Sequence, residues 1–339
     1  MAQWRSDDLG EGFERLDLDL GEDNEGPLTA TLVRALPPRR PLLDRLLRRE
    51  RPLEAVDVLY VHGWSDYFFQ TSLARFFTDR GARFFALDLR KYGRSLREGQ
   101  TPGFITQLDD YGAEIELALA EIAEQTAAGE QRRLVLFGHS TGGLVLSLWA
   151  AAHPGRADAV ILNSPWIEFQ LSATARQLIA PIINLSARIH AFDVGPQFDY
   201  GYYDRAQHEV GPAEDLARVN DAWRPSRAHA VHTGWLRAIL DGHARVHSGL
   251  GIEVPILTLL SQSWAAPLRW SEELTRADTV LEVDEVAAAA VRLGSNVTVE
   301  RIDGALHDVF LSSLEAREEA YARLDRWLVG WQAADRIGS

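Results

Sequence analysis

Short apolar runs separated by helical patterns fill most of the chain after Asp57. The runs DVLYVHG, RFFALDLR and RLVLFGHS are almost continuously apolar, and AVILNSP, PILTLLS and NVTVERIDG continue the series. Strands that are apolar on both faces and alternate with helices are typical of a parallel sheet that helices cover on both sides. The pattern therefore predicts an α/β fold with a mostly parallel central sheet.

The two ends of the chain carry different patterns. Residues 12–36 alternate apolar and polar positions on either side of an acidic turn, which predicts a half-exposed antiparallel hairpin that starts the sheet. The segment from Leu314 to Trp331 has apolar residues at helical intervals, so we expect a final helix that lies on the sheet. The basic stretch 37–52 is interpreted as a solvated excursion at the surface.

Between Trp166 and about Ile252 the alternation of strands and helices stops. A connection this long inside a compact domain is usually functional. We predict that residues 167–252 form a cap inserted into a catalytic domain made of residues 1–166 and 253–339. Its aromatic residues either wall an apolar pocket above the nucleophile or form only a small core of the cap itself. They are Phe169, Phe192, Phe198, Tyr200, Tyr202, Tyr203 and Trp235, together with Trp166 directly before the cap.

Composition narrows the classes of partner. The 339 residues carry a formal net charge of -14, which repels nucleic-acid phosphates and anionic lipid headgroups and favours small neutral substrates. The absence of cysteine excludes disulfides and thiolate catalysis. The opening MAQWRSDDLGEGFE lacks the basic start and apolar core of a signal peptide, and no stretch approaches a run of about 18 apolar residues. We therefore expect a cytoplasmic protein without membrane insertion.

One motif points directly to chemistry. Gly138-His139-Ser140-Thr141-Gly142 matches the G-x-S-x-G elbow, in which a strand turns sharply into a helix and exposes a serine at the apex. Here the motif follows the strand pattern LVLF and precedes the helical pattern GLVLSLWAAA, as the elbow requires. We predict that Ser140 is a nucleophile.

An uncharged serine is a poor nucleophile, so a base must take its proton, and in this fold the partners follow in the order Ser, acid, His. Eight histidines lie after Ser140, but only His307 follows the last predicted strand. It lies in GALHDVF, on a Gly-containing loop before the final helix. We predict that His307 is the general base.

The acid must follow the strand pattern PILTLLS, and the carboxylates available to orient the imidazole include Asp278, Glu282, Asp284 and Glu285. Asp278 precedes a short apolar run, whereas Asp284 belongs to the helical pattern VDEVAAAAVRLG, where a carboxylate is more typical of a solvated face. We favour Asp278 as the acid and keep Asp284 as the alternative.

Acyl transfer also needs donors for the negative charge that develops on the carbonyl oxygen. His62-Gly63-Trp64 ends the strand DVLYV, where this fold supplies one backbone N–H, and the residue after the nucleophile supplies the other. The expected donors are Trp64 and Thr141. His62 is expected to be buried under this loop, without a role in proton transfer.

Taken together, several motifs resemble the monoacylglycerol lipase and serine aminopeptidase-like group of α/β hydrolases, over about residues 55–330. They are HGWSDYF, LDLRKYGRS, GHSTGG, ILNSPW and the late Asp278 with GALHD. The resemblance implies an α/β-hydrolase fold with a cap after ILNSPW, the triad Ser140, Asp278 and His307, oxyanion donors Trp64 and Thr141, and no metal or organic cofactor. One departure is SQSWAAPLRWSEELTRA, which separates Asp278 from its strand, whereas the family acid follows within a few residues.

These observations predict a serine hydrolase that cleaves a moderately hydrophobic ester or a monoacylglycerol-like lipid through an acyl-enzyme on Ser140. Trp166, Phe169 and His139 are the candidates for substrate contact. A lactone, a thioester or a short peptide would use the same machinery, and a weakly catalytic small-molecule-binding protein on the same fold is the alternative from another class. Dehalogenase or epoxide hydrolase chemistry needs a carboxylate at the elbow, so Ser140 argues against it.

Overall fold

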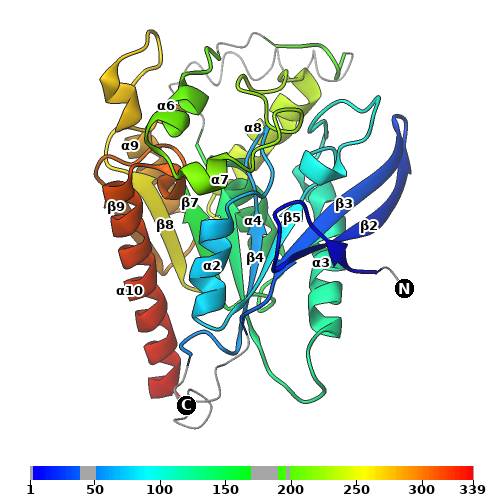
Figure 1. Cartoon of the computed structure of the whole chain (residues 1–339), viewed down its shortest axis with the longest axis vertical. Helices are drawn as coiled ribbons and strands as arrows, with labels where there is room; N and C mark the ends of the chain where they lie inside the picture. Colours follow the sequence, from blue (N-terminus) through cyan, green and yellow to red (C-terminus); the bar gives the residue numbers. More distant parts are fainter. Residues whose placement is uncertain (1–2, 39–50, 169–189, 196–198, 339) are drawn as a thin grey trace.

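The computed structural model describes residues 3–38, 51–168, 190–195 and 199–338 (Figure 1). Within these ranges the chain forms one nine-stranded sheet with helices on both of its faces (Figure 1). No helix in the described part of the chain is both long enough and apolar enough to cross a membrane.

Six strands of the sheet are parallel, as the apolar runs predicted. In spatial order they are β5 (Arg83–Asp88), β4 (Val56–Val61), β6 (Arg133–His139), β7 (Ala159–Asn163), β8 (Ile256–Ser261) and β9 (Val297–Ile302). The chain passes from β4 to β5 on one side and then returns to place β6 on the other side of β4. In open α/β sheets a ligand site lies outside the carboxyl ends of the strands at such a reversal. The topology therefore directs attention to the loops that follow β4 and β6.

The predicted antiparallel hairpin is also present. β2 (Phe13–Asp23) and β3 (Gly26–Ala35) pair with each other, with an irregular register between Asp19 and Glu22, and β3 pairs in antiparallel fashion with β5. The short β1 (Arg5–Ser6) completes this edge of the sheet. The hairpin extends the parallel sheet on the side away from β9.

Two buried layers flank the sheet because successive strand residues point to opposite faces. Tyr60 of β4 packs in the layer with α2 (Thr71–Asp79) and α10 (Leu314–Gly338), whereas Leu59 packs in the opposite layer. That second layer contains α3 (Gly112–Glu124), α4 (Thr141–Ala152), α8 (Thr233–His247) and α9 (Val283–Ala290). The predicted final helix is thus confirmed, and so is the burial of the sheet on both faces. Short 3₁₀ turns occur at η1 (Gly93–Ser95), η2 (Leu108–Tyr111), η3 (Glu272–Thr275) and η4 (Val309–Leu311).

The segment between β7 and β8 contains α6 (Tyr202–Val210), α7 (Ala213–Leu216) and α8, which lie above the sheet in Figure 1. Its described residues do not stand apart from the catalytic body. Leu216 is buried in the layer of α2 and α10, while Trp235 and Ile239 are buried in the layer of α4. This part of the insertion therefore extends the two cores of the sheet.

Candidate active site

Ser140 lies at the turn between β6 and α4. Its φ of 50° is in the left-handed region, which is strained for a residue with a side chain and typical of a nucleophile at an elbow. Its N–H donates to the carbonyl oxygen of Asn163 at 3.0 Å, and its own carbonyl oxygen accepts from the N–H groups of Gly143 at 3.0 Å and Trp166 at 2.9 Å. The apex is therefore held by the end of β7 and by the start of the insertion.

Glycines allow the elbow to approach the end of β4. A Cβ at Gly142 would lie 2.4 Å from the carbonyl oxygens of Val61 and His62, and one at Gly63 would lie 3.0 Å from Cβ of Ser140. The first contact would require the backbone to shift, and the second would displace Ser140 by a few tenths of an ångström. The small residues of both motifs are thus needed so that the loop after β4 can lie against the nucleophile.

The structure brings His307 and Asp278 together in the interior, where they are 3% and 0% exposed. His307 Nδ1 and Asp278 Oδ2 are 2.9 Å apart. The other oxygen, Oδ1, accepts from the N–H groups of Val280 at 2.7 Å and Leu281 at 2.8 Å. Because the carboxylate accepts at Nδ1, the imidazole carries its proton there and keeps the lone pair of Nε2 for proton abstraction.

His307 also lies close to the residue that precedes Ser140. The ring of His307 is centred 5.1 Å from the ring of His139, the residue directly before Ser140. The loops that follow β6 and β9 therefore meet at one end of the sheet.

The long excursion between β8 and Asp278 begins and ends at the same point. Asp278 donates its N–H to the carbonyl oxygen of Ser263 at 3.0 Å, and its own carbonyl oxygen accepts from the N–H of Ala265 at 2.9 Å. Asp278 therefore occupies a position just beyond the end of β8, even though SQSWAAPLRWSEELTRA separates it from the strand in sequence. The departure from the family pattern is thus an excursion that returns Asp278 to the end of β8.

The alternative acid lies elsewhere. Asp284 is in the first turn of α9, its side chain is 86% exposed, and Oδ1 accepts from Arg301 at 2.6 Å. The structure thus brings Asp278, and not Asp284, to His307.

The loop after β4 is fixed by His62. Nε2 of His62 accepts from the N–H of Leu89 at 3.1 Å, so the proton of the neutral ring is on Nδ1 and donates to the carbonyl oxygen of Gly63 at 2.8 Å. In a trans peptide the C=O and N–H point in opposite directions, so the N–H of Trp64 points away from the His62 ring. Thr141 begins α4, where the first N–H groups have no partner inside the helix.

His139, expected to contact substrate, is buried in the interior. Its Nδ1 lies 3.0 Å from the carbonyl oxygen of Asn163, and its Nε2 lies 3.9 Å from Oδ2 of Asp308. Burial lowers the pKa of His139. A neutral ring in this position supports the elbow from below.

Asp308 is a buried carboxylate that the sequence did not single out. Its oxygens accept from Gln70 Nε2 at 2.5 Å, from Asn163 Nδ2 at 2.8 Å and from the N–H of Phe310 at 2.9 Å. These bonds join the histidine loop to α2 and to the end of β7. The only signal in the sequence was the position of Asp308 directly after His307.

The aromatic residues of the insertion fall into separate groups. Trp235 is buried, with its ring 3.9 Å from that of Trp64 and 5.7 Å from that of Trp166. Tyr203 lies 5.6 Å from the ring of His307, whereas Tyr200 is exposed. Tyr202 packs on Trp270 and Phe192 on Phe104. Phe169 and Phe198 lie outside the described residues.

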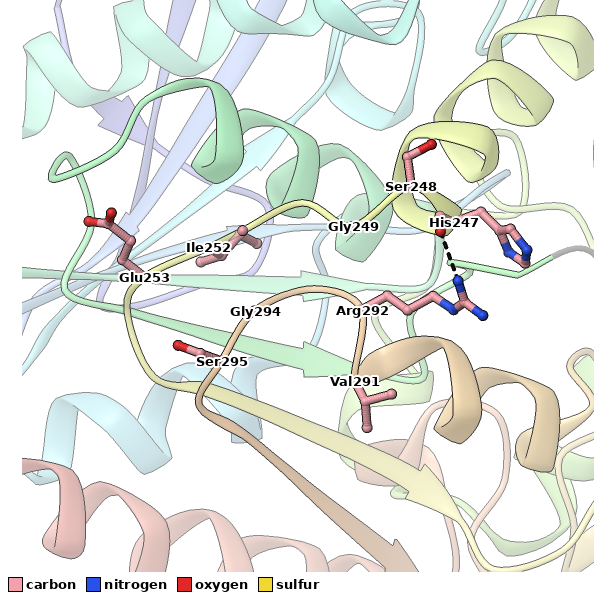
Figure 2. A pocket seen from close by; sticks show the side chains of 10 residues that line it. His247, Ser248, Gly249, Ile252, Glu253, Val291, Arg292, Gly294 and Ser295 are labelled. Atoms are coloured by element: carbon pink, nitrogen blue, oxygen red, sulfur yellow. Dashed lines mark hydrogen bonds between the residues drawn. The ribbon is translucent and has the colours of Figure 1, made fainter.

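A cavity of about 550 Å³ lies far from this constellation (Figure 2). It is lined by the segments that lead into β8 and β9, where Ile252 pairs with Gly294, so it lies at the amino ends of the strands. Arg292 donates to the carbonyl oxygen of His247 at 2.8 Å across it (Figure 2). Ser140, Asp278 and His307 instead follow the carboxyl ends, so the cavity is not part of their site. Among the described residues, no three His, Asp or Glu side chains are grouped in a way that could hold a metal ion.

Comparisons with known proteins agree with this architecture. Residues 54–313 match the family described as Hydrolase_4, serine aminopeptidase, S33. The chain is similar to a monoacylglycerol lipase from Paleococcus ferrophilus, at 18% identity and a TM-score of 0.58 over 81% of this chain and 94% of that one. The chain is also similar to a soluble variant of monoglyceride lipase from Saccharomyces cerevisiae, at 14% identity and a TM-score of 0.62. This match covers 93% of this chain and 96% of that one.

A highly thermostable carboxyl esterase from Bacillus coagulans, in complex with glycerol, gives 14% identity and a TM-score of 0.61 over 95% of this chain and 100% of that one. At these identities the likeness to solved structures shows the fold alone. A comparison with curated proteins found no match. The predicted α/β-hydrolase fold is confirmed.

Proposed function

The chain belongs to the serine aminopeptidase family of α/β hydrolases, and on that premise we propose that it hydrolyses carboxylic esters through an acyl-enzyme on Ser140. The observation that carries the proposal is the buried hydrogen bond of 2.9 Å between His307 and Asp278, next to a serine at a strained elbow. A serine, a base and an orienting acid are the parts that acyl transfer requires.

In the proposed reaction Nε2 of His307 takes the proton of Ser140 Oγ as the oxygen attacks the ester carbonyl. The carbonyl π electrons move to oxygen, and the N–H groups of Trp64 and Thr141 stabilise the resulting negative charge. Collapse expels the alcohol, which receives the proton from His307 and leaves the acyl group on Ser140. A water molecule, deprotonated by His307, then hydrolyses the acyl-enzyme and releases the acid. Asp278 holds the imidazole and stabilises its charged form.

The surroundings support an uncharged, moderately hydrophobic ester or a monoacylglycerol-like substrate. Trp64 and Trp166 pack around Trp235 beside the elbow, and a net charge of -14 disfavours anionic substrates. By their names, two of the structurally similar proteins are monoacylglycerol lipases and a third is a carboxyl esterase, which supports a substrate of this kind. We propose Trp166 as a substrate contact.

A direct test is turnover of p-nitrophenyl esters from acetate to palmitate, together with monoacylglycerols and lactones. We expect the wild-type protein to hydrolyse at least one of these esters and Ser140→Ala to hydrolyse none. Because the family is described as serine aminopeptidases, aminoacyl p-nitroanilides form a second arm. Hydrolysis confined to that arm would contradict esterase activity and favour a peptidase. Failure of a fluorophosphonate to label Ser140 would favour a binding protein.

Substrate selection is tested at Trp166. Trimming Trp166 to alanine should change the preference for acyl chain length by about 1–3 kcal/mol of transition-state binding, the range for altered apolar contacts. The measurement is kcat/KM across the ester series, with thermal melting beside it. An unchanged profile with a strongly lowered melting temperature would show that this ring only holds the insertion together.

A further inference from the structure

A line of polar side chains, buried except for the half-buried Tyr203, joins the loops after β4 and β9 through the insertion. It runs from Asp66, two residues after Trp64, through Arg224, Gln207 and Tyr203 to the backbone of Asp308, the residue after His307. Arg224, Gln207 and Tyr203 all belong to the insertion. One end of the line is in residues 62–66, here named the oxyanion loop, and the other is in residues 303–308, the histidine loop.

The first half of the line is an ion pair in the interior. Arg224 Nε donates to Asp66 Oδ1 at 3.0 Å, and the two residues are 7% and 6% exposed. A second carboxylate, Asp204 of α6, lies 3.4 Å from Nη1 of Arg224. A guanidinium is a planar fork with donors in fixed directions, so it sets the orientation of the groups it binds. Arg224 therefore fixes Asp66 relative to α6.

The second half reaches the catalytic histidine. Arg224 Nη2 donates to Gln207 Oε1 at 2.5 Å, and Gln207 Nε2 donates to the hydroxyl of Tyr203 at 2.7 Å. That hydroxyl accepts from the N–H of Asp308 at 3.1 Å, while the Tyr203 ring lies against His307. Each side chain in the line is oriented by the next.

The oxyanion loop needs such support because its backbone is strained. Ser65, the residue after Trp64, has a φ of 52°, a left-handed conformation that is unfavourable for a residue with a side chain. Its hydroxyl accepts from the N–H of His229 at 3.0 Å, so the same stretch of the insertion that carries Arg224 also holds Ser65. Strained conformations persist only where the surrounding structure determines them.

We propose that Arg224 is a positioning residue for catalysis: through Asp66 on one side and Gln207 and Tyr203 on the other, it holds the Trp64 N–H in register with His307. The inference rests on the proposed ester hydrolysis by Ser140. It makes the insertion part of the catalytic geometry, since an oxyanion donor displaced by about 1 Å can cost on the order of 10²-fold in rate.

The test uses the full-length protein and three alterations of the line. Arg224→Met breaks it at its centre, and Tyr203→Phe removes only the hydroxyl at the far end. The double variant Asp66→Asn, Arg224→Met removes both charges of the buried pair, so it breaks the line without leaving the Asp66 carboxylate unpaired. Asp204 also loses Arg224 in this variant, but its side chain is partly exposed and lies 3.6 Å from His208. Arg237→Met is the matched control, because Arg237 lies in the same insertion and pairs with Asp241 on the surface of α8. Thermal melting shows which variants are folded.

Two readouts separate positioning from mere folding. The first is the split between kcat and KM on the preferred ester. The second is the inhibition constant of a trifluoromethyl ketone: Ser140 Oγ adds to its carbonyl carbon, the π electrons move to oxygen, and the serine proton passes to His307. This adduct carries the oxyanion, whereas the bound ester does not.

We expect kcat of Arg224→Met and of the double variant to fall by about 10- to 100-fold without a comparable rise in KM, and the inhibition constant of the ketone to rise by a similar factor. Tyr203→Phe should show a smaller loss, and Arg237→Met none. If Arg224→Met and the double variant are folded and keep their kcat, or if only their KM rises, the positioning role of Arg224 is wrong. The proposed esterase activity would be unaffected by that result. An inactive wild-type protein would overturn the esterase itself.

Discussion

Two buried carboxylate–imidazole pairs lie side by side in this molecule, and they differ in one respect. Asp278 and His307 are joined by a hydrogen bond of 2.9 Å, whereas Asp308 and His139 come no closer than 3.9 Å. The two imidazole rings are only 5.1 Å apart, and all four side chains are buried. Burial therefore does not distinguish the two pairs, whereas the hydrogen bond does.

The difference lies in how the carboxylate oxygens are occupied. Backbone N–H groups bind only Oδ1 of Asp278, and Oδ2 is left for the imidazole. Both oxygens of Asp308 are taken by amide donors, from Gln70, Asn163 and Phe310. The first carboxylate can stabilise a charged imidazole, and the second binds three elements together. The orientation of the lone pairs thus separates the pair proposed for catalysis from the structural one.

The largest effect is expected from the proposed nucleophile and its base, Ser140 and His307. Ser140→Ala and His307→Ala should each reduce kcat on the order of 10⁶-fold, and the double variant should be no worse, because members of one catalytic unit lose activity non-additively. Initial rates on the preferred ester measure this. A double variant far worse than either single one would show that the two residues act separately.

The orienting acid should have the next largest effect. Asp278→Asn is expected to lower kcat on the order of 10⁴-fold, because an amide favours the wrong tautomer of His307. Asp284→Asn is the control and should leave kcat unchanged, since that side chain is exposed and paired with Arg301. A mild loss for Asp278→Asn with a severe one for Asp284→Asn would exchange their roles.

The structural pair should respond mainly in stability. Asp308→Ala leaves the amides of Asn163 and Gln70 without their buried acceptor, so the free energy of unfolding should fall by about 1–3 kcal/mol for each donor that stays unpaired. Denaturant unfolding measures this. Asp303→Ala, at an exposed position in the same loop, should change it by less than about 0.5 kcal/mol. Equal stability of the two variants would contradict the binding role of Asp308.

The smallest effect concerns pH. Burial lowers the pKa of His139 below its usual value, so below about pH 6.5 the unfolded chain binds a proton that the folded chain does not. The stabilising contribution of the neutral ring is present above that pH and is lost as pH falls, by up to about 1.4 kcal/mol per pH unit.

The measurement compares unfolding free energies of the wild-type protein and His139→Gln from about pH 7.5 to about pH 5.5, a window that spans the usual titration of histidine. The wild-type protein should lose more stability than the variant. Equal slopes would show that His139 titrates alike in both states and is not held neutral by burial.

The sequence by itself determined the parts of the site that depend on local geometry. The elbow around Ser140 needs glycines at fixed positions, and the contacts of Gly142 and Gly63 show why. The alternation of apolar runs and helices determined the parallel sheet, because a strand buried on both faces must be apolar throughout. The place of His307 followed from strand order, since it is the only histidine after the last strand.

The tertiary structure decided what depends on contacts between distant segments. Several carboxylates follow β8, and it is the return of the excursion to Ser263 that brings Asp278 to His307. Arg224 and Asp66 are 158 positions apart, so no local pattern pairs them. A buried hydrogen bond is specified by both partners and by the fold between them, whereas a motif records only neighbours along the chain.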